Sequence, residues 1–200
     1  MLMRILRSTD YRRMPWKNGK GETVEIAVFP PDAAIDDFDW RISMATVAED
    51  GPFSVFDGID RTLSVLSGDG IRLLVDGQGS IDLFQHSAPH SFPADTATSA
   101  RLLGGPITDL NIMTRRGLWR HHVSPHITTD GPFAAPENAF SFILALDHCR
   151  TTGLGGGEGT ILERFDTLAL APGEGGVAFT PDYPAQLLIT ELEPAMVRQK

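Results

Sequence analysis

Three blocks of polar and aromatic residues contain the side chains that could bind a small molecule. In the first block, Trp16 precedes an Asn-Gly turn. The ammonium of Lys17 and the amide of Asn18 could close over a ligand as a lid. The alternative is a plain loop that the tryptophan anchors. In the second, two arginines lie on expected strands, where an ion pair with Asp39 or Asp60 is the structural alternative. In the third, Leu110 and Ile112 face one side of a strand and the residues 109, 111, 113 and 115 face the other, which predicts a mainly polar inner wall. The candidate binding residues of the three blocks are Trp16, Lys17, Asn18, Trp40, Arg41, Ser43, Arg61, Asn111, Met113 and Arg115.

The histidines do not have the spacing of a metal site on strands. Two ligands on one face of a strand need the pattern His-x-His, because only residues two apart point the same way. The pairs His86/His90 and His122/His126 are instead four apart and lie among Pro and Ser residues that favour loops. We therefore expect no metal and no other cofactor.

Nucleophilic catalysis also lacks a motif. The single cysteine, Cys149, excludes an intrachain disulfide and follows an apolar run typical of a buried strand. No Gly-x-Ser-x-Gly elbow is present. We assign no catalytic residue and expect a binding protein rather than an enzyme.

The elements that must position these residues are strands. Apolar residues recur with period two, as at Phe38, Trp40, Ile42 and Met44, and Gly and Pro turns separate the short runs. This pattern predicts an all-β sandwich or barrel, with jelly-roll topology among the options. The expected strand runs are 23–29, 61–66, 71–75, 80–85, 107–113, 139–148, 160–170 and 186–192.

Two glycine-rich turns divide residues 61–85. Because the turns at 67–70 and 76–79 both favour positive φ, we expect two hairpins and hence a three-stranded meander.

Charge and hydropathy narrow the range of partners. The net charge of −9 has the wrong sign for nucleic acid or an anionic membrane surface, and no apolar stretch has the length of a membrane span. We expect a soluble, cytoplasmic protein.

The three blocks resemble the HutD/Ves-like family. The family pattern Pro-Trp-Lys-Asn-Gly matches at residues 15–19, Phe-Asp-Trp-Arg-Ile-Ser at 38–43, Gly-Pro-Phe-Ser-x-Phe at 51–56, Gly-Ile-Asp-Arg at 58–61 and Gly-Pro-x-x-Asp-Leu-Asn at 105–111. Lys20 departs from this pattern, because it replaces the middle glycine of the family's glycine run.

The resemblance implies a bicupin, that is, two stacked cupin-type jelly-roll barrels in one chain. Residues 1–117 would form the N-terminal barrel and residues 118–200 the C-terminal one. The two barrels would pack closely as one globular unit, and an exchange of strands between them is an open alternative. It also implies a link to histidine utilisation and a ligand that is a small carboxylate metabolite, such as urocanate or formylglutamate.

The residue types suit such a ligand. Arginine offers a carboxylate two parallel donors, so Arg41 or Arg61 is the expected anchor. Amide and hydroxyl groups can bond an imidazole or amide, and an indole can cover a flat conjugated group. Together with Lys17, the two arginines should make a local positive pocket in an acidic protein.

Two other interpretations stay open. A metal-dependent cupin enzyme would bring His86, His90 and a carboxylate together in space despite their spacing. A homodimer formed through strand edges would make the chain an interaction module.

Overall fold

The computed structural model describes residues 3–16, 21–153, 159–180 and 184–195. In these ranges the regular structure consists of β-strands and two single-turn 3-10 helices, Ser8–Asp10 and Thr128–Asp130. This part of the chain contains no helix with the length and apolar character needed to cross a membrane. The predicted all-β class is confirmed.

The chain separates into two compact units. One consists of Met1–Tyr11 and His121–Pro194, and the other of Arg12–Arg120 and Ala195–Lys200. The N-terminal residues join the later part of the chain because strand β1 (Arg4–Leu6) pairs antiparallel with β17 (Thr167–Leu170). Two cupin jelly rolls over residues 1–117 and 118–200 stay a prediction.

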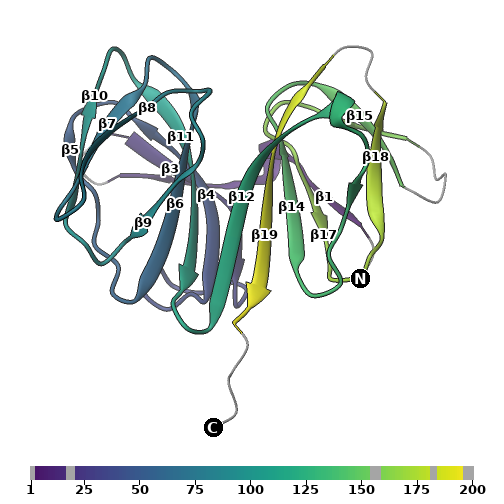
Figure 1. Ribbon diagram of the computed structural model, residues 1–200, viewed down its shortest axis with the longest axis horizontal. Coiled ribbons are helices and arrows are strands. Elements are labelled where there is room, and N and C mark those ends of the chain that lie inside the picture. The colour runs from purple at the N-terminus through teal and green to yellow at the C-terminus, as the bar shows by residue number, and fades with distance from the viewer. Residues whose placement is uncertain (1–2, 17–20, 154–158, 181–183, 196–200) are drawn as a thin grey trace, which may run out of the picture. The chain divides into compact units, whose positions relative to one another are not determined.

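The Arg12–Arg120 unit contains two antiparallel sheets (Figure 1). The six-stranded sheet has the order β2-β3-β4-β11-β6-β9, with bounds Arg12–Pro15, Gly21–Phe29, Trp40–Val47, Ile107–Arg115, Ile59–Ser67 and His90–Pro93. The four-stranded sheet has the order β5-β10-β7-β8, with bounds Gly51–Pro52, Thr98–Leu102, Ile71–Val75 and Gly79–Leu83.

The two sheets of this unit share a hydrophobic core. Leu63 and Val65 on β6 and Ile107 on β11 pack in one cluster with Ile71 and Leu73 on β7. Period-two alternation brings these side chains to one face of each strand, and burying a Leu or Ile side chain stabilises a fold by about 1.5–3 kcal/mol. The core occupies one part of this face, and the polar residues of β4, β6 and β11 occupy the rest.

The other unit also contains two sheets. The five-stranded sheet has the order β1-β17-β14-β19-β12 and the four-stranded sheet the order β13-β18-β15-β16. The bounds not yet given are β12 Trp119–Ile127, β13 Phe133–Ala134, β14 Phe140–Ala145, β15 Cys149–Gly153, β16 Thr160–Leu162, β18 Gly176–Thr180 and β19 Gln186–Pro194. Cys149 lies in the core of this unit, and burial raises the pKa of its thiol to about 11, so it packs as an apolar side chain.

Of the predicted three-stranded meander, the second hairpin is confirmed and the first is wrong. Strands β7 and β8 form the expected hairpin, but β6 lies in the six-stranded sheet and β7 in the four-stranded one. Gly68 and Gly70, with φ of 96° and 100°, lie where the chain passes between the sheets, and a Cβ on Gly68 would lie 2.5 Å from the carbonyl oxygen of Pro106. The glycines therefore mark a tight crossing rather than a hairpin turn.

The expected run 160–170 is likewise two strands. Strands β16 and β17 belong to different sheets, and the turn between them contains Phe165, whose φ of 69° breaks the extended conformation. The polar residues Glu163, Arg164 and Asp166 interrupt the apolar pattern at this break, so the sequence contains a signal for it that the predicted single run passed over.

Candidate ligand-binding site

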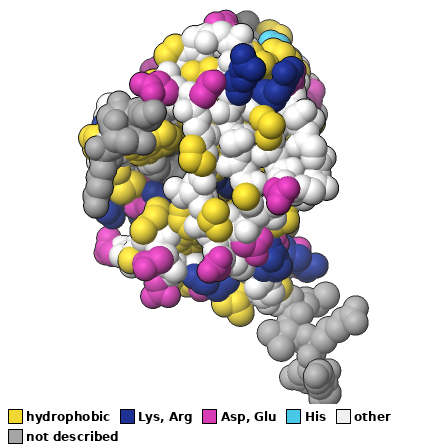
Figure 2. Space-filling model, turned by 90° about the vertical axis from the view of Figure 1, so that its left-hand side faces the viewer, with side chains coloured by type: hydrophobic (Ala, Val, Ile, Leu, Met, Phe, Trp, Pro, Cys, Tyr) yellow, Lys and Arg dark blue, Asp and Glu magenta, His cyan; other side chains and the backbone are white. Residues whose placement is uncertain are grey.

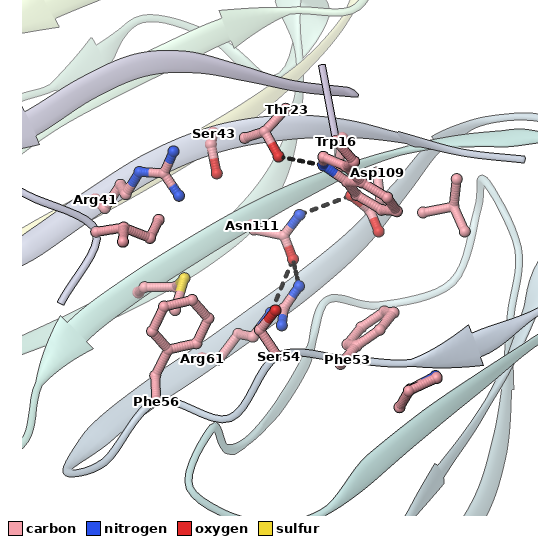
Figure 3. A pocket seen from close by; sticks show the side chains of 15 residues that line it. Trp16, Thr23, Arg41, Ser43, Phe53, Ser54, Phe56, Arg61, Asp109 and Asn111 are labelled. Atoms are coloured by element: carbon pink, nitrogen blue, oxygen red, sulfur yellow. Dashed lines mark hydrogen bonds between the residues drawn. The ribbon is translucent and has the colours of Figure 1, made fainter. Parts of the chain in front are cut away.

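A cavity of about 450 Å³ opens within the Arg12–Arg120 unit. Strands β3, β4, β6 and β11 supply its polar wall, and the segment after β5 supplies Phe53 and Phe56. Figure 3 shows the polar side chains of the strands and the two phenylalanine rings around one space. The cavity is thus a polar and aromatic pocket built mainly on strands.

Strand register explains why polar groups meet there. Met113 on β11 is paired with Arg41 on β4 and with Arg61 on β6, so the two arginines flank it on the neighbouring strands. Two residues earlier on β11, Asn111 is paired with Ser43. The prediction that the third block forms a polar inner wall agrees with this arrangement.

Six of the ten candidate binding residues line the cavity. They are Trp16, Arg41, Ser43, Arg61, Asn111 and Met113. Lys17 and Asn18 lie outside the described residues. Trp40 and Arg115 are not among the lining residues.

The two candidates that do not line the cavity have contacts elsewhere. Trp40 points to the opposite face of β4 from Arg41 and stacks on Phe29, with ring centroids 5.8 Å apart and planes 13° apart. At the end of β11, Arg115 donates from Nη2 to the carbonyl oxygen of Phe38 at 2.7 Å. Both residues support the architecture around the site.

A hydrogen-bonded chain of three side chains crosses the cavity wall. Arg61 donates from Nε to Asn111 Oδ1 at 2.9 Å and also from Nη2 to the same oxygen. Asn111 Nδ2 donates to Asp109 Oδ1 at 2.6 Å. The Arg61 guanidinium also lies 4.4 Å from the centroid of the Phe53 ring. Arg61 is therefore held in place by an amide and an aromatic ring. Its side chain is half-buried and lines the cavity (Figure 3).

Arg41 is held by a different partner. Its Nε donates to Glu25 Oε2 on β3 at 2.7 Å, and both side chains are nearly buried. The predicted structural pairs with Asp39 and Asp60 are wrong, because these partly exposed carboxylates pair with Arg115 and Arg116 instead.

Burial changes the protonation of the Asp109–Arg61 pair. Desolvation raises the pKa of Asp109 from 3.8 to about 6, and the charge of Arg61 and the Asn111 hydrogen bond offset part of this effect. Desolvation also lowers the pKa of Arg61 to about 10, against the attraction of Asp109. At neutral pH the wall therefore presents the charged Arg61 guanidinium beside a carboxyl group whose pKa of about 6 is close to neutrality.

Trp16 forms part of the wall through its ring and a hydrogen bond. Its Nε1 donates to Thr23 Oγ1 on β3 at 2.8 Å, and its backbone N–H donates to the carbonyl oxygen of Gly21 at 2.9 Å. The tryptophan thus lines the cavity and is fixed to β3, whereas the predicted lid formed by Lys17 and Asn18 lies outside the described residues and stays a prediction.

The candidate residues omitted Asp109, Phe53 and Phe56. Asp109 has a signal in the sequence, because it lies two residues before Asn111 on a strand and so shares its face. The two phenylalanines belong to the irregular segment after β5, where no periodicity indicates direction.

One face of the Arg12–Arg120 unit has mixed charge. Figure 2 shows acidic, basic and hydrophobic side chains interspersed on the face that carries β5, β7, β8 and β10. Among the residues that the structure describes, no three His, Cys, Asp or Glu side chains form a group that could hold a metal ion.

The sequence pattern of the HutD family matches residues 8–188. The chain belongs to the HutD family. This finding confirms the resemblance inferred from the three blocks. A relative from Pseudomonas putida, an uncharacterized 21.2 kDa protein in the hutC 3′ region, is 47% identical over 111 residues, or 56% of this chain and 57% of that protein. The chain thus matches a little over half the length of this relative.

Two solved structures cover nearly all of this HutD-family chain. A conserved protein of unknown function from Pseudomonas aeruginosa PAO1 is 34% identical with a TM-score of 0.86, and the match covers 96% of this chain and 100% of that one. HutD from Pseudomonas fluorescens SBW25 is 27% identical with a TM-score of 0.76, and the match covers 96% of this chain and 98% of that one. Structures of much lower identity share the cupin-like β fold and bear on the fold alone.

Proposed function

We propose that this HutD-family protein binds a small carboxylate metabolite of histidine catabolism, of the urocanate or formylglutamate type, and modulates histidine utilisation. The observation that carries the proposal is the pair of arginines, Arg41 and Arg61, on one wall of a cavity. The genomic description of the Pseudomonas putida relative, in the hutC 3′ region, supports the link to this pathway.

The size and lining of the cavity suit such a ligand. A volume of about 450 Å³ falls within the usual range for small-molecule pockets. Guanidinium groups offer a carboxylate charge-assisted hydrogen bonds, and the rings of Trp16, Phe53 and Phe56 offer a flat conjugated group apolar contact.

Affinity in the micromolar range is the expected outcome. A ligand of about ten non-hydrogen atoms would need roughly 0.8 kcal/mol per atom for a micromolar dissociation constant, which is within the limit for small ligands. Nanomolar binding would need about 1.2 kcal/mol per atom and a more complete enclosure.

Calorimetric titration with urocanate, histidine and formylglutamate tests the proposal. We expect micromolar binding of one of the pathway carboxylates, and at least a tenfold loss of affinity in Arg61→Gln, because the ligand then loses a charged donor worth more than about 1.4 kcal/mol. Arg72→Gln is the matched control, since Arg72 lies in the same unit but pairs with Asp82 across the β7–β8 hairpin and does not line the cavity.

Two results would contradict the proposal. One is the absence of heat and of a thermal shift with all three compounds at millimolar concentration. The other is equal weakening by Arg61→Gln and Arg72→Gln, which would show that general charge and not the cavity controls binding.

A further inference from the structure

One oxygen of the cavity carboxylate is left without a hydrogen-bond partner. Asp109 is 1% exposed, and its Oδ1 accepts the hydrogen bond from Asn111. Its Oδ2 is buried and accepts no hydrogen bond of normal length and angle among the described residues, although the backbone N–H of Ala45 on β4 lies near the carboxyl group and helps to lower its pKa. Because Asp109 also lines the cavity, this oxygen is an acceptor that a ligand could use.

The neighbouring groups fix which oxygen is left over. Arg61 can only donate hydrogen bonds, so the oxygen of the Asn111 amide must face it and the NH₂ group must face Asp109. The side chains on either side therefore determine the orientation of the amide. Asp109 Oδ1 is occupied as a result, and Oδ2 is the acceptor that remains.

A ligand that is only a carboxylate suits this wall poorly. Its anionic group would be attracted by Arg41 and Arg61 but repelled by Asp109, and Oδ2 would stay buried without a donor. A ligand that also carries an N–H group can donate to this oxygen while its carboxylate meets a guanidinium. The wall thus offers complementary partners for two groups of opposite hydrogen-bonding character.

We propose that Asp109 is a specificity-determining residue that selects carboxylate ligands carrying an N–H donor, the N–H group donating to Oδ2 while the carboxylate pairs with Arg41 or Arg61. The inference rests on the proposed function and specifies its ligand class. A site built to bond an N–H group rejects an analogue that lacks it, because a buried acceptor is then left unpaired.

A matched pair of ligands tests the inference. Urocanate and 3-(3-furyl)acrylate have a similar shape and the same carboxylate, but the furan ring has no N–H group. At pH 8 the imidazole of urocanate is neutral with one N–H, and we expect the native protein to bind urocanate at least tenfold more tightly than the furan.

Asp109→Asn then identifies the residue responsible. We expect the preference for urocanate to fall below about threefold, while the furan analogue binds as tightly as before or more tightly, because the repelling charge is gone. Asp82→Asn is the matched control, because Asp82 is a partly exposed carboxylate on β8 of the same unit and away from the cavity, and this variant should keep the full preference.

The outcomes separate this inference from the proposed function. Equal binding of the two ligands to the native protein would overturn the selection by Asp109 and leave carboxylate binding intact, whether or not the variant folds. Binding of neither ligand nor of any pathway carboxylate would overturn both proposals. A preference that survives unchanged in folded Asp109→Asn would overturn the role of this residue.

Discussion

At the scale of single residues, the pKa of Asp109 is the property that sequence patterns do not predict. Asp109 is a buried carboxyl group that shares a hydrogen-bond chain with Asn111 and Arg61, yet its pKa is raised by burial to about 6. The attraction of Arg61 does not fully compensate for the lost hydration, because an amide separates the two charged groups. The site therefore keeps a carboxylate at a cost in stability.

This cost predicts how stability depends on pH. Because the pKa of Asp109 is higher in the folded state than in the unfolded state, the free energy of unfolding falls as the pH rises from 3.8 through about 6. The total loss is about 3 kcal/mol, of which about 2 kcal/mol falls between pH 4 and pH 7.5. The measurement is the free energy of unfolding of Asp109→Asn and of the native protein in urea at both pH values. The difference between them should shift by about 2 kcal/mol in favour of the variant from pH 4 to pH 7.5.

The charged groups near Asp109 do not reverse this sign. Arg61 on β6 has a pKa of about 10 and stays protonated over this range, so it does not titrate together with Asp109. Asp82→Asn gives the opposite control, because Arg72 holds the pKa of Asp82 below its usual value and its stabilising effect is present at the higher pH. A difference between Asp109→Asn and the native protein that is constant with pH would contradict the assignment.

At the scale of elements, the start of β3 shows how the strands form the wall. A Cβ on Gly21 would lie 2.1 Å from the carbonyl oxygen of Thr46 on β4 and 3.0 Å from the ring of Trp16. Because glycine has no Cβ, β3 can approach β4 closely at this position and the Trp16 ring can pack against Gly21. The family's glycine run ends at this residue, which gives a steric reason for its last glycine.

Gly21→Ala should disturb both the strand pair and the cavity wall. We expect a loss of about 1–3 kcal/mol in the free energy of unfolding, because an extra carbon in a tightly packed place forces the backbone or Trp16 to move. Ligand affinity should fall with it, since Trp16 lines the cavity.

Gly51→Ala is the matched control, because no atom lies within 4 Å of its added Cβ. Thermal denaturation compares the two variants, and a change of 1 kcal/mol corresponds to about 2–4 °C for a chain of this size. Equal melting temperatures for the two variants would contradict the steric role of Gly21.

At the scale of the whole molecule, the chain does not divide simply into an early and a late half. The unit built mainly from His121–Pro194 also contains Met1–Tyr11. Asp166, 2% exposed, holds this N-terminal segment, since it accepts from Arg7 Nη1 at 2.7 Å and from the backbone N–H of Ser8 at 2.8 Å. Burial alone would raise the pKa of Asp166, but these hydrogen bonds lower it below its usual value.

Asp166→Ala should loosen one unit and leave the ligand site intact. It removes the acceptor of several hydrogen bonds, at an expected cost of about 2–3 kcal/mol. Hydrogen exchange followed by mass spectrometry should show faster exchange in β1 and β17, with the strands of the cavity unchanged.

Glu163→Gln provides the comparison, because the Glu163 side chain is exposed and its partner is His148. Faster exchange in the cavity strands β4, β6 and β11 upon Asp166→Ala would contradict the independence of the ligand site from this segment.

The sequence by itself determines the strands and which of their residues share a face. Alternation along β4 and β11 predicts strands and predicts that Arg41 and Ser43, or Asn111 and Met113, share a face, because successive residues of a strand point to opposite sides. The all-β class and four residues of the cavity wall follow from this local ground, whereas Trp16 and Arg61 are predicted from their residue types in the first two blocks.

The tertiary structure decided the rest. Trp40 and Arg41 both lie in the buried strand β4, and only the packing of other strands determines that the arginine faces the cavity. The positive pocket expected from Arg41 and Arg61 is balanced by Glu25 on β3 and Asp109 on β11, residues distant in sequence that strand pairing brings near. Burial, and with it the pKa of Asp109, depends on such distant neighbours, so no local pattern could determine it.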